Sequence, residues 1–334
     1  MVVLVVRRLI ALIPLLLGVT VVLFVLTHLL PADPVRVALG QDATPEQVRA
    51  YREELQLNTP LWQQYIRYVG NLIRGDFGKS IISRRPVVQD LRAFFPATLE
   101  LTLTSIIFSS VVAIPLGISA AVNRGRWVDR LAQILSLFTA SMPVFWFGVL
   151  LQIIFYARSG WLPAADRLDA DLTPPATITG MYTFDSLVAG DTAVFFNALK
   201  HLVLPALVLS NINLAILARI TRSSMLDVLG EGYVVTARAK GLSERRVLYR
   251  HALENALVPI ITIAGMRFGD LMAGAILTET IFSWPGIGRY AVFSIERIDY
   301  PALIGFAVVA TLLYALVNLG VDIMYAVIDP RMRP

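Results

Sequence analysis

Long apolar runs alternate with shorter polar segments along the chain, and the apolar runs define its architecture. The runs carry few charged residues, and a bilayer core of about 30 Å is crossed by about 20 helical residues. The pattern therefore predicts an all-α integral membrane protein with six transmembrane helices. The six predicted spans cover residues 9–30, 97–122, 131–157, 201–218, 257–281 and 302–328.

The first apolar run follows Arg7 and Arg8, an arrangement that also occurs in cleaved signal peptides. This run is longer than the apolar region of a signal peptide, and the segment after it has no small-residue cleavage pattern. We therefore expect residues 1–30 to be a retained N-terminal segment that contains the first transmembrane helix.

Residues 31–96 are polar and mixed in charge, which predicts a helical insertion outside the membrane. Thr44, Pro45 and Gln47 form a capping-box pattern at the start of one helix. Thr59 and Pro60 mark the start of a second helix. Residues 97–334 then form the core membrane domain with the other five transmembrane helices.

The composition supports a membrane location. Of the 334 residues, 56% are hydrophobic and 16% are charged, against about 25% charged in soluble domains. The formal net charge of +5 comes from basic residues beside the apolar runs, so membrane topology explains it without nucleic acid. The chain has no cysteine, which excludes disulfides and thiolate metal sites, and its three scattered histidines form no zinc pattern.

The distribution of arginine and lysine predicts the orientation, because cytoplasmic loops are enriched in both. This places both termini in the cytoplasm. The insertion at 31–96 is also basic, but long loops cross the membrane largely regardless of charge. The basic residues assigned to the cytoplasmic side are Arg7, Arg8, Arg124, Arg126, Arg130, Arg219, Arg222, Arg238, Lys240, Arg245, Arg246, Arg250, Arg331 and Arg333.

The segment 231–259, between the fourth and fifth runs, is basic and amphipathic and predicts a helix, a turn and a second helix. Gly241 suits a left-handed stop for the first helix, and Ser243 suits an N-cap for the second. A helix of about ten residues needs a surface to pack on. Small residues such as Ala237 leave room for another protein. The segment is therefore either a docking element for a cytoplasmic partner or a basic connecting loop.

Charged residues also occur inside the fifth predicted span. Arg267 and Asp270 are three residues apart and share a helix face, and Glu279 lies near the end of the span. Ionisable groups in a span normally face protein or water, so these three either line a transport pathway or form structural salt bridges. Four uncharged polar residues are expected to form hydrogen bonds between helices: Gln152, Asn211, Asn213 and Asn318.

Several stretches resemble a known family. Thr236-Ala237-Arg238-Ala239-Lys240-Gly241-Leu242 resembles the cytoplasmic loop of ABC importer permeases in its peptide/nickel form, although Val235-Thr236-Ala237 stands where the general importer consensus has Glu-Ala-Ala. Three further stretches resemble dipeptide and oligopeptide permeases: Gly75-Asp76-Phe77-Gly78, Phe282-Ser283-Trp284-Pro285-Gly286-Ile287-Gly288 and the tail Asp329-Pro330-Arg331-Met332-Arg333.

The resemblance implies a permease subunit of a dipeptide or oligopeptide ABC importer, with the type I importer permease bundle as its fold and the cell inner membrane as its location. It implies a second homologous permease subunit, two cytoplasmic ABC ATPase subunits that hold ATP and Mg²⁺, and an extracytoplasmic binding protein that delivers peptide. The chain itself is then expected to be neither an enzyme nor a cofactor protein.

The resemblance also assigns residues to these contacts. The loop at about 223–254 would couple to the ATPases, and Trp284 would lie in an outer loop that faces the binding protein. The implied coupling residues are Glu231, Tyr233, Thr236, Ala237, Arg238, Lys240 and Gly241.

Alternatives remain open at this stage. Within the family, nickel or glutathione import is the nearest. Outside it, an ion-coupled secondary transporter would use charged residues in the spans as a relay, although no internal repeat is evident. Gly78-Lys79-Ser80 resembles the end of a phosphate-binding loop, but Ile73 stands where that motif needs its first glycine. The relay residues would be Arg267, Asp270, Glu279 and Asp322.

Overall fold

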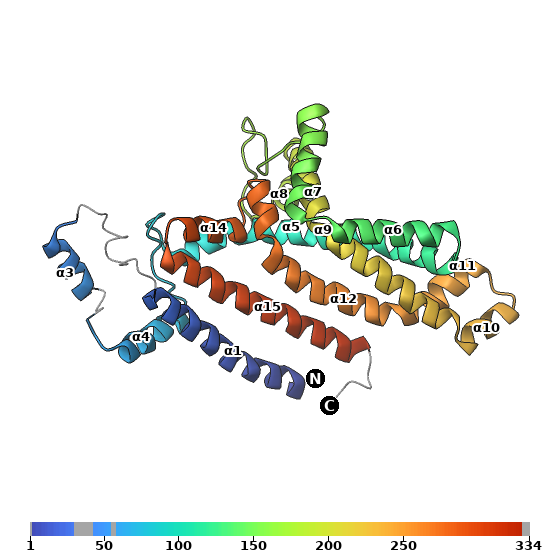
Figure 1. Cartoon of the computed structure of the whole chain (residues 1–334), viewed down its shortest axis with the longest axis horizontal. Coiled ribbons are helices and arrows are strands. Elements are labelled where there is room, and N and C mark those ends of the chain that lie inside the picture. The colour runs from blue at the N-terminus through green and yellow to red at the C-terminus, as the bar shows by residue number, and fades with distance from the viewer. Residues whose placement is uncertain (1, 30–42, 55–57, 329–334) are drawn as a thin grey trace.

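The computed structural model describes residues 2–29, 43–54 and 58–328. Helices dominate these residues, and their β pairing is an isolated bridge between Lys79 and Pro86. The helices form one elongated bundle, with α3 and α4 at one end and α10 and α11 at the other (Figure 1). The elements are α1 (Val2–Leu29), α3 (Pro45–Glu54), α4 (Leu61–Ile73), α5 (Val87–Val122), α6 (Trp127–Ser141), α7 (Val144–Leu151), the π-helix η1 (Gln152–Arg158), α8 (Tyr182–Ala189), α9 (Thr192–Leu229), α10 (Gly232–Ala239), α11 (Glu244–Arg246), the π-helix η2 (Val247–Ala252), α12 (Leu253–Gly274), α13 (Ile276–Ile281), α14 (Ile287–Glu296) and α15 (Tyr300–Ile328).

Four helices within the described ranges are long and apolar enough to cross a membrane, and a fifth span results if the bent pair α6 and α7–η1 counts as one. The four lie in α1, α5, α9 and α15. The fifth predicted span, residues 257–281, is divided between α12 and α13. α12 carries the charged residues Glu254, Arg267 and Asp270, and it packs in the bundle against α15 and α9.

The centre of the bundle is the close packing of α5 on α9, which contact each other along much of their length. A side chain on Gly117 would place its Cβ 2.5 Å from Thr221 Cβ and 2.7 Å from the Ala218 carbonyl oxygen. The two backbones therefore approach each other at a position where only glycine fits. Small residues at membrane helix interfaces allow such approach, because the packing itself supplies the stabilisation.

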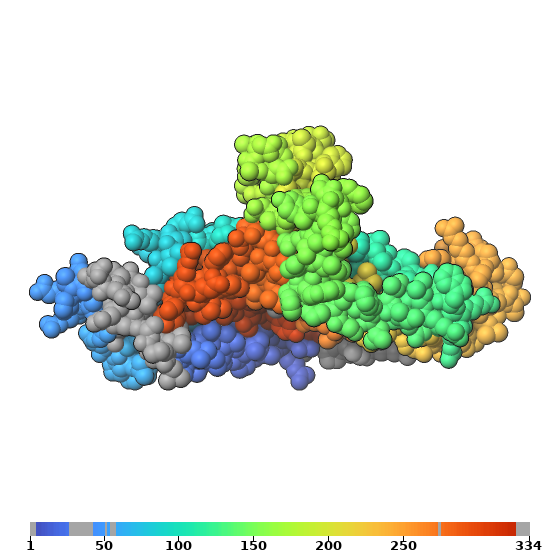
Figure 2. All heavy atoms as spheres, turned by 45° about the horizontal axis from the view of Figure 1, so that its top comes forward, coloured from blue at the N-terminus to red at the C-terminus, as the bar shows by residue number. Residues whose placement is uncertain are grey.

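The third predicted span, 131–157, is not a single straight helix. α6 ends at Ser141, Met142 is extended with φ −80° and ψ 125°, and α7 begins after Pro143 at an angle of 101°. A proline disfavours helical geometry in the residue before it, which explains the break. The segment from α7 through α8 projects from the elongated bundle as a result (Figure 2). The prolines inside α5, α9 and α12 leave those helices continuous.

The helical signals of the insertion are confirmed in its described part. The Thr44 backbone N–H donates to Gln47 Oε1 at 2.9 Å, and the Gln47 N–H donates to Thr44 Oγ1 at 3.3 Å, which completes the capping box. The expected boundary at residue 96 falls inside α5, which begins at Val87. The end of the insertion is fastened to the C-terminal half, since Ser80 Oγ donates to Asp299 Oδ2 at 2.5 Å. The tail at 329–334 lies outside the described residues.

Two of the expected hydrogen bonds between helices are present. Gln152 Nε2 donates to the carbonyl oxygens of Ala164 at 2.9 Å and Ile281 at 3.2 Å. Asn211 Nδ2 in α9 donates to the Thr139 carbonyl oxygen in α6 at 2.9 Å. The second bond uses a carbonyl group near the end of α6, where the chain breaks before Pro143.

We expect Gly117→Val to destabilise the subunit, because the new side chain would separate α5 from α9. Overpacking of this kind costs about 1–3 kcal/mol. The thermal unfolding midpoint of the purified protein in detergent should fall. Gly18→Val in α1 is the matched control, because nothing lies within 4 Å of a Cβ at Gly18. Equal midpoints for the two variants would show that the α5–α9 approach does not require glycine.

Candidate functional site

The basic segment 231–259 folds as the sequence predicts, into a helix, a turn and a second helix. α10 ends at Ala239, and Gly241 adopts a left-handed φ of +74°. A Cβ on Gly241 would meet nothing within 4 Å, so glycine is needed there for its backbone conformation alone. Ser243, the expected N-cap of the second helix, makes no side-chain capping bond.

One face of α10 is buried against the protein's own chain. Val234 and Ala237 pack with Val247 of η2 in a small core that also includes Leu229 and Leu242. Ala237 is 7% exposed, so the expectation that it leaves room for a partner is wrong. Its small size instead allows α10 to lie close to η2. The exposed coupling candidates are Glu231, Tyr233, Thr236, Arg238, Lys240 and Gly241.

An ion pair joins α10 to α11 across the turn. Arg238 Nη2 donates to Glu244 Oε1 at 2.7 Å, and Arg238 Nε donates to Oε2 at 3.2 Å. The hydrogen bond from Arg238 lowers the pKa of Glu244 against the opposing effect of burial, and the same bond raises the pKa of Arg238. The pair therefore supports the turn at neutral pH, and this support is lost as acidification protonates Glu244.

A basic groove of about 520 Å³ lies beside this turn. Its lining residues belong to α11, η2 and the residues on either side, at the same end of the bundle as α10 (Figure 1). Such a surface favours a partner with acidic groups. The groove is lined by Ser243, Arg245, Arg246, Tyr249, Arg250 and Glu254.

A buried ion pair braces the helices that lead to this loop. Arg222 of α9 donates to both carboxylate oxygens of Asp129 in α6, at 2.6 and 2.8 Å. The Gly125 backbone N–H and the Gln133 side chain also donate to Asp129. This bidentate geometry fixes the orientation of α6 relative to α9. A cavity of about 530 Å³ lies alongside, between α5, α6 and α9.

Of the two roles open to Glu279, the structure supports the structural one. Its side chain is fully buried, where it accepts a hydrogen bond from Thr98 Oγ1 at 2.5 Å and one from the Arg289 N–H at 2.8 Å. A Cβ on Gly286 would lie 2.2 Å from Glu279 Oε1, and a Cβ on Gly288 would lie 2.9 Å from Oε2. The carboxylate thus occupies the N-terminus of α14, where backbone N–H groups favour an anion.

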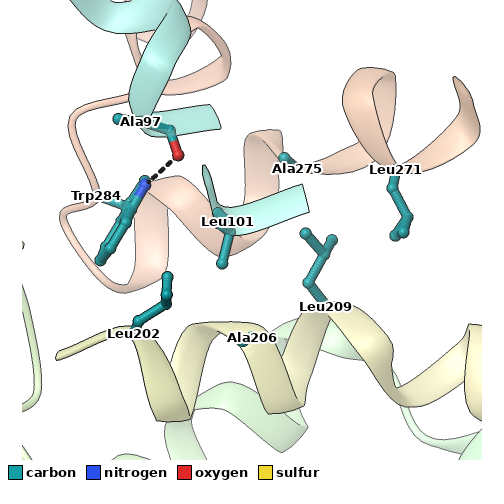
Figure 3. Close-up of a cluster of buried hydrophobic side chains, with 8 residues drawn as sticks. All are labelled: Ala97, Leu101, Leu202, Ala206, Leu209, Leu271, Ala275 and Trp284. Atoms are coloured by element: carbon teal, nitrogen blue, oxygen red, sulfur yellow. Dashed lines mark hydrogen bonds between the residues drawn. The ribbon is translucent and has the colours of Figure 1, made fainter. Parts of the chain in front are cut away.

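Trp284 is also internal, so its expected contact with an outer partner is wrong for the side chain. The indole is 1% exposed, and its Nε1 donates to the Ala97 carbonyl oxygen at 2.8 Å (Figure 3). It packs with Leu101 of α5 and Leu202 of α9. The Trp-Pro-Gly segment therefore closes one end of the bundle from within.

Sequence reasoning missed a second internal ion pair near this end. Arg167 Nη2 donates to Glu100 Oε2 at 2.5 Å, with both side chains buried. The guanidinium carbon also lies 3.5 Å from the centre of the Tyr182 ring, and the Thr183 N–H donates to Glu100. The pair holds the segment before α8 on α5. A carboxylate within the second predicted span was the available signal for it.

Arg267 and Asp270 form the intrahelical pair that their spacing suggests, with a distance of 2.9 Å from Nη1 to Oδ2. Their side chains are 35% and 48% exposed. The other two members of the suggested relay lie elsewhere, since Glu279 binds Thr98 and Asp322 pairs with Arg8 of α1 at 2.7 Å. The structure therefore does not assemble the four groups into a relay.

These features define a class of protein. Several apolar helices form a bundle suited to a membrane, one end is closed by internal polar contacts, and the other end presents an exposed basic helix-turn-helix. Within the residues the structure describes, no group of three or more histidine, aspartate or glutamate side chains is placed to hold a metal ion. The arrangement is that of an α-helical membrane protein with an exposed basic surface at one end of its bundle.

Comparison with known proteins identifies the family. The model of the binding-protein-dependent transport system inner membrane component matches residues 113–334, and the model of its N-terminal part matches residues 1–102. The chain belongs to this family and is an inner-membrane transport permease component.

Individual relatives are similar over nearly the whole chain. The probable D,D-dipeptide transport system permease protein DdpB of Escherichia coli is 48% identical over 94% of this chain and 93% of its own length. The di/tripeptide transport system permease protein DppB of Pseudomonas aeruginosa is 46% identical over 98% and 97%. The glutathione transport system permease protein GsiC of Salmonella paratyphi A is 40% identical over 98% of both chains.

A solved structure supports the fold. A chain of the MetNI methionine ABC transporter, in an inward-facing conformation, matches 70% of this chain and 93% of its own length with a TM-score of 0.52. At 16% sequence identity, this likeness concerns the arrangement of the helices.

We expect Glu279→Gln to lower the thermal stability of the purified subunit. The amide would present an N–H donor where the native carboxylate oxygens receive two donors, and an unsatisfied buried group costs about 1–3 kcal/mol. Glu296→Gln, at the exposed last residue of α14, is the matched control. An unfolding midpoint unchanged by Glu279→Gln would show that the carboxylate does not hold the turn.

Proposed function

We propose that this chain is one of two homologous membrane subunits of an ATP-driven importer that moves dipeptides and short oligopeptides into the cell. A binding protein outside the membrane delivers the peptide, and two cytoplasmic ATPase subunits hold ATP and Mg²⁺. The proposal is supported by family membership and by relatives whose names specify dipeptide and di/tripeptide transport.

The exposed face of α10 is the proposed contact with an ATPase subunit. Tyr233, Thr236 and Lys240 are exposed on α10 or at its end, while Val234 and Ala237 anchor the helix to the bundle. A short helix with one face packed on the bundle and the opposite face exposed can transmit force from a partner that binds the exposed face. This combination of an anchored and an exposed face is the observation that carries the coupling role.

Force would travel from this loop into the membrane through α9. This helix is continuous from Thr192 to Leu229, about 57 Å at 1.5 Å per residue. Val228 and Leu229 at its end pack on the core of α10, and Arg222 binds Asp129 of α6. A displacement of the loop would therefore move α9 and α6 together as a rigid body, which suits alternating access to a central pathway.

The proposed topology places both termini and α10 in the cytoplasm of a multi-pass inner-membrane protein. The positive residues on that side support this orientation. The insertion with α3 and α4 would then lie outside, at the opposite end of the bundle, where a binding protein docks.

A glutathione importer is the alternative within the family, and it is supported by a relative whose name specifies glutathione transport. Glutathione is itself a short peptide, so both readings require a pathway for a small zwitterionic substrate. Nickel import is less compatible with the peptide-specific names of the most similar relatives reported above. Transport of labelled dipeptide and glutathione by the same reconstituted complex separates the two substrates.

We expect Lys240→Glu to reduce peptide-stimulated ATP hydrolysis by the reconstituted complex by about ten-fold. A loss of about 1.4 kcal/mol in the docking contact corresponds to that factor. Lys240 is exposed beside α10, so the change should leave the fold of the subunit intact.

The matched control is Arg124→Glu, which reverses the charge of another exposed residue in the turn between α5 and α6. Its stimulated ATPase activity should stay near that of the unmodified complex. Equal rates for Lys240→Glu and the unmodified complex would contradict the docking assignment. Failure of the membrane subunits to co-purify with any ATPase would contradict the proposed function itself.

A further inference from the structure

The Arg267–Asp270 ion pair differs from the other ion pairs of the described residues because both partners belong to one helix. Each of the others joins different segments. Arg222–Asp129 connects α9 to α6, Arg167–Glu100 holds a loop on α5, and Arg8–Asp322 joins α1 to α15, while Arg238–Glu244 closes the α10–α11 turn. The Arg267–Asp270 pair therefore secures no tertiary contact.

The surroundings of the pair leave it available. About a third of the Arg267 side chain and about half of the Asp270 side chain are uncovered by this chain, and neither makes a further hydrogen bond within the described residues. Met266 beside them is also exposed, as is Tyr314 of α15. Tyr314 lies against Gly269, where a Cβ would be 3.2 Å from its ring. Two opposite charges thus lie together on a partly exposed face of α12, apart from the buried face on which Gly269 meets Tyr314.

Structural stability does not account for these charges. A partly exposed ion pair of this spacing contributes only about 0.3–0.5 kcal/mol. Placing an arginine or an aspartate in the middle of a membrane helix costs about 2.5–3.5 kcal/mol each on insertion scales. Because the cost exceeds the gain, the pair has to face water or a polar partner, and its presence requires a use other than holding the helix.

We propose that Arg267 and Asp270 form a transit subsite for the charged ends of a zwitterionic short peptide. Arg267 receives the α-carboxylate, and Asp270 receives the α-ammonium group. The inference rests on the proposed peptide-import function and specifies which feature of the peptide the membrane subunit recognises. The resting ion pair opens, and each side chain exchanges its internal partner for the corresponding end of the peptide.

The dimensions and charges suit this exchange. Residues three apart on a helix have Cβ atoms about 5–6 Å apart, and a dipeptide spans at most about 7 Å. Two flexible side chains that start from Cβ atoms at this separation reach both ends of a dipeptide. The exchange replaces one ion pair with two and exposes no net charge, so the weak resting pair is readily opened. A peptide with one blocked end leaves one side chain without its partner.

The test is uptake into proteoliposomes that contain the complete importer, with Ala-Ala, N-acetyl-Ala-Ala and Ala-Ala-amide as substrates. Each is supplied with saturating, fully loaded binding protein, so that the maximal rates report the membrane subunits. We expect the unmodified importer to transport Ala-Ala about ten-fold faster than either blocked peptide, as the loss of about 1.4 kcal/mol in one charge-assisted contact predicts.

The variants should lose this preference one end at a time. With Asp270→Asn, Ala-Ala should no longer be transported faster than N-acetyl-Ala-Ala, but it should still be transported faster than Ala-Ala-amide. With Arg267→Gln, Ala-Ala should no longer be transported faster than Ala-Ala-amide, but it should still be transported faster than N-acetyl-Ala-Ala. The double exchange Arg267→Asp with Asp270→Arg keeps both charges on the helix and should retain a preference for free ends. It serves as the second variant if a single change impairs folding, which the thermal unfolding midpoint reports.

The matched control is Asp322→Asn, which breaks the partly exposed Arg8–Asp322 pair between α1 and α15. It should leave the ratios among the three peptides unchanged. Equal loss of all three substrates in the Arg267 and Asp270 variants, or unchanged ratios, would overturn the subsite. No uptake of any peptide by the unmodified importer, with ATP hydrolysis intact, would overturn the proposed function and this inference with it.

Discussion

The need to satisfy each ionisable group within the bundle governs this structure. A bilayer offers no water to an exposed charge, so a buried carboxylate or guanidinium must find its partners in protein. Asp129 pairs with Arg222, and Glu100 pairs with Arg167. Glu279 accepts a hydrogen bond from a backbone N–H group at the start of α14. The first two contacts join residues that are 93 and 67 positions apart in the sequence, and Glu279 also binds Thr98, 181 positions away. The polar contacts therefore fix, together with the close packing of α5 on α9, how the apolar helices are arranged.

The long helix α9 connects the two ends that these contacts stabilise. Near one end, Leu202 packs on the buried Trp284, and towards the other end Arg222 holds Asp129 before the chain enters α10. No proline break interrupts α9, whereas Pro143 separates α6 from α7. The subunit therefore combines one continuous element with one bent element. This division suits a protein in which one part has to move as a unit while another shapes the surface around it.

The sequence predicted the helical membrane fold and the helix-turn-helix, because both depend on local patterns. Apolar runs and the glycine at 241 need no knowledge of distant residues. It did not predict the inward position of Ala237, Glu279 and Trp284, because their burial depends on Val247, Thr98 and Ala97, which no local pattern connects to them. The bend at Pro143 was also missed. Proline is tolerated inside α5, α9 and α12, so the residue type alone does not distinguish a break from a continuous helix.

The turn around Glu279 has a consequence for how the protein is made. Thr98 donates a hydrogen bond to Glu279, 181 residues away, and accepts one from the Ile287 N–H, 189 residues away, while Ala97 accepts one from Trp284, 187 residues away. During synthesis, α5 emerges from the ribosome long before its partners exist. At about 5–20 residues per second, the wait lasts roughly 10–40 seconds. The contacts of Thr98 with Glu279 and Ile287 can therefore form only after most of the polypeptide has been translated, so α5 reaches its final packing late in synthesis.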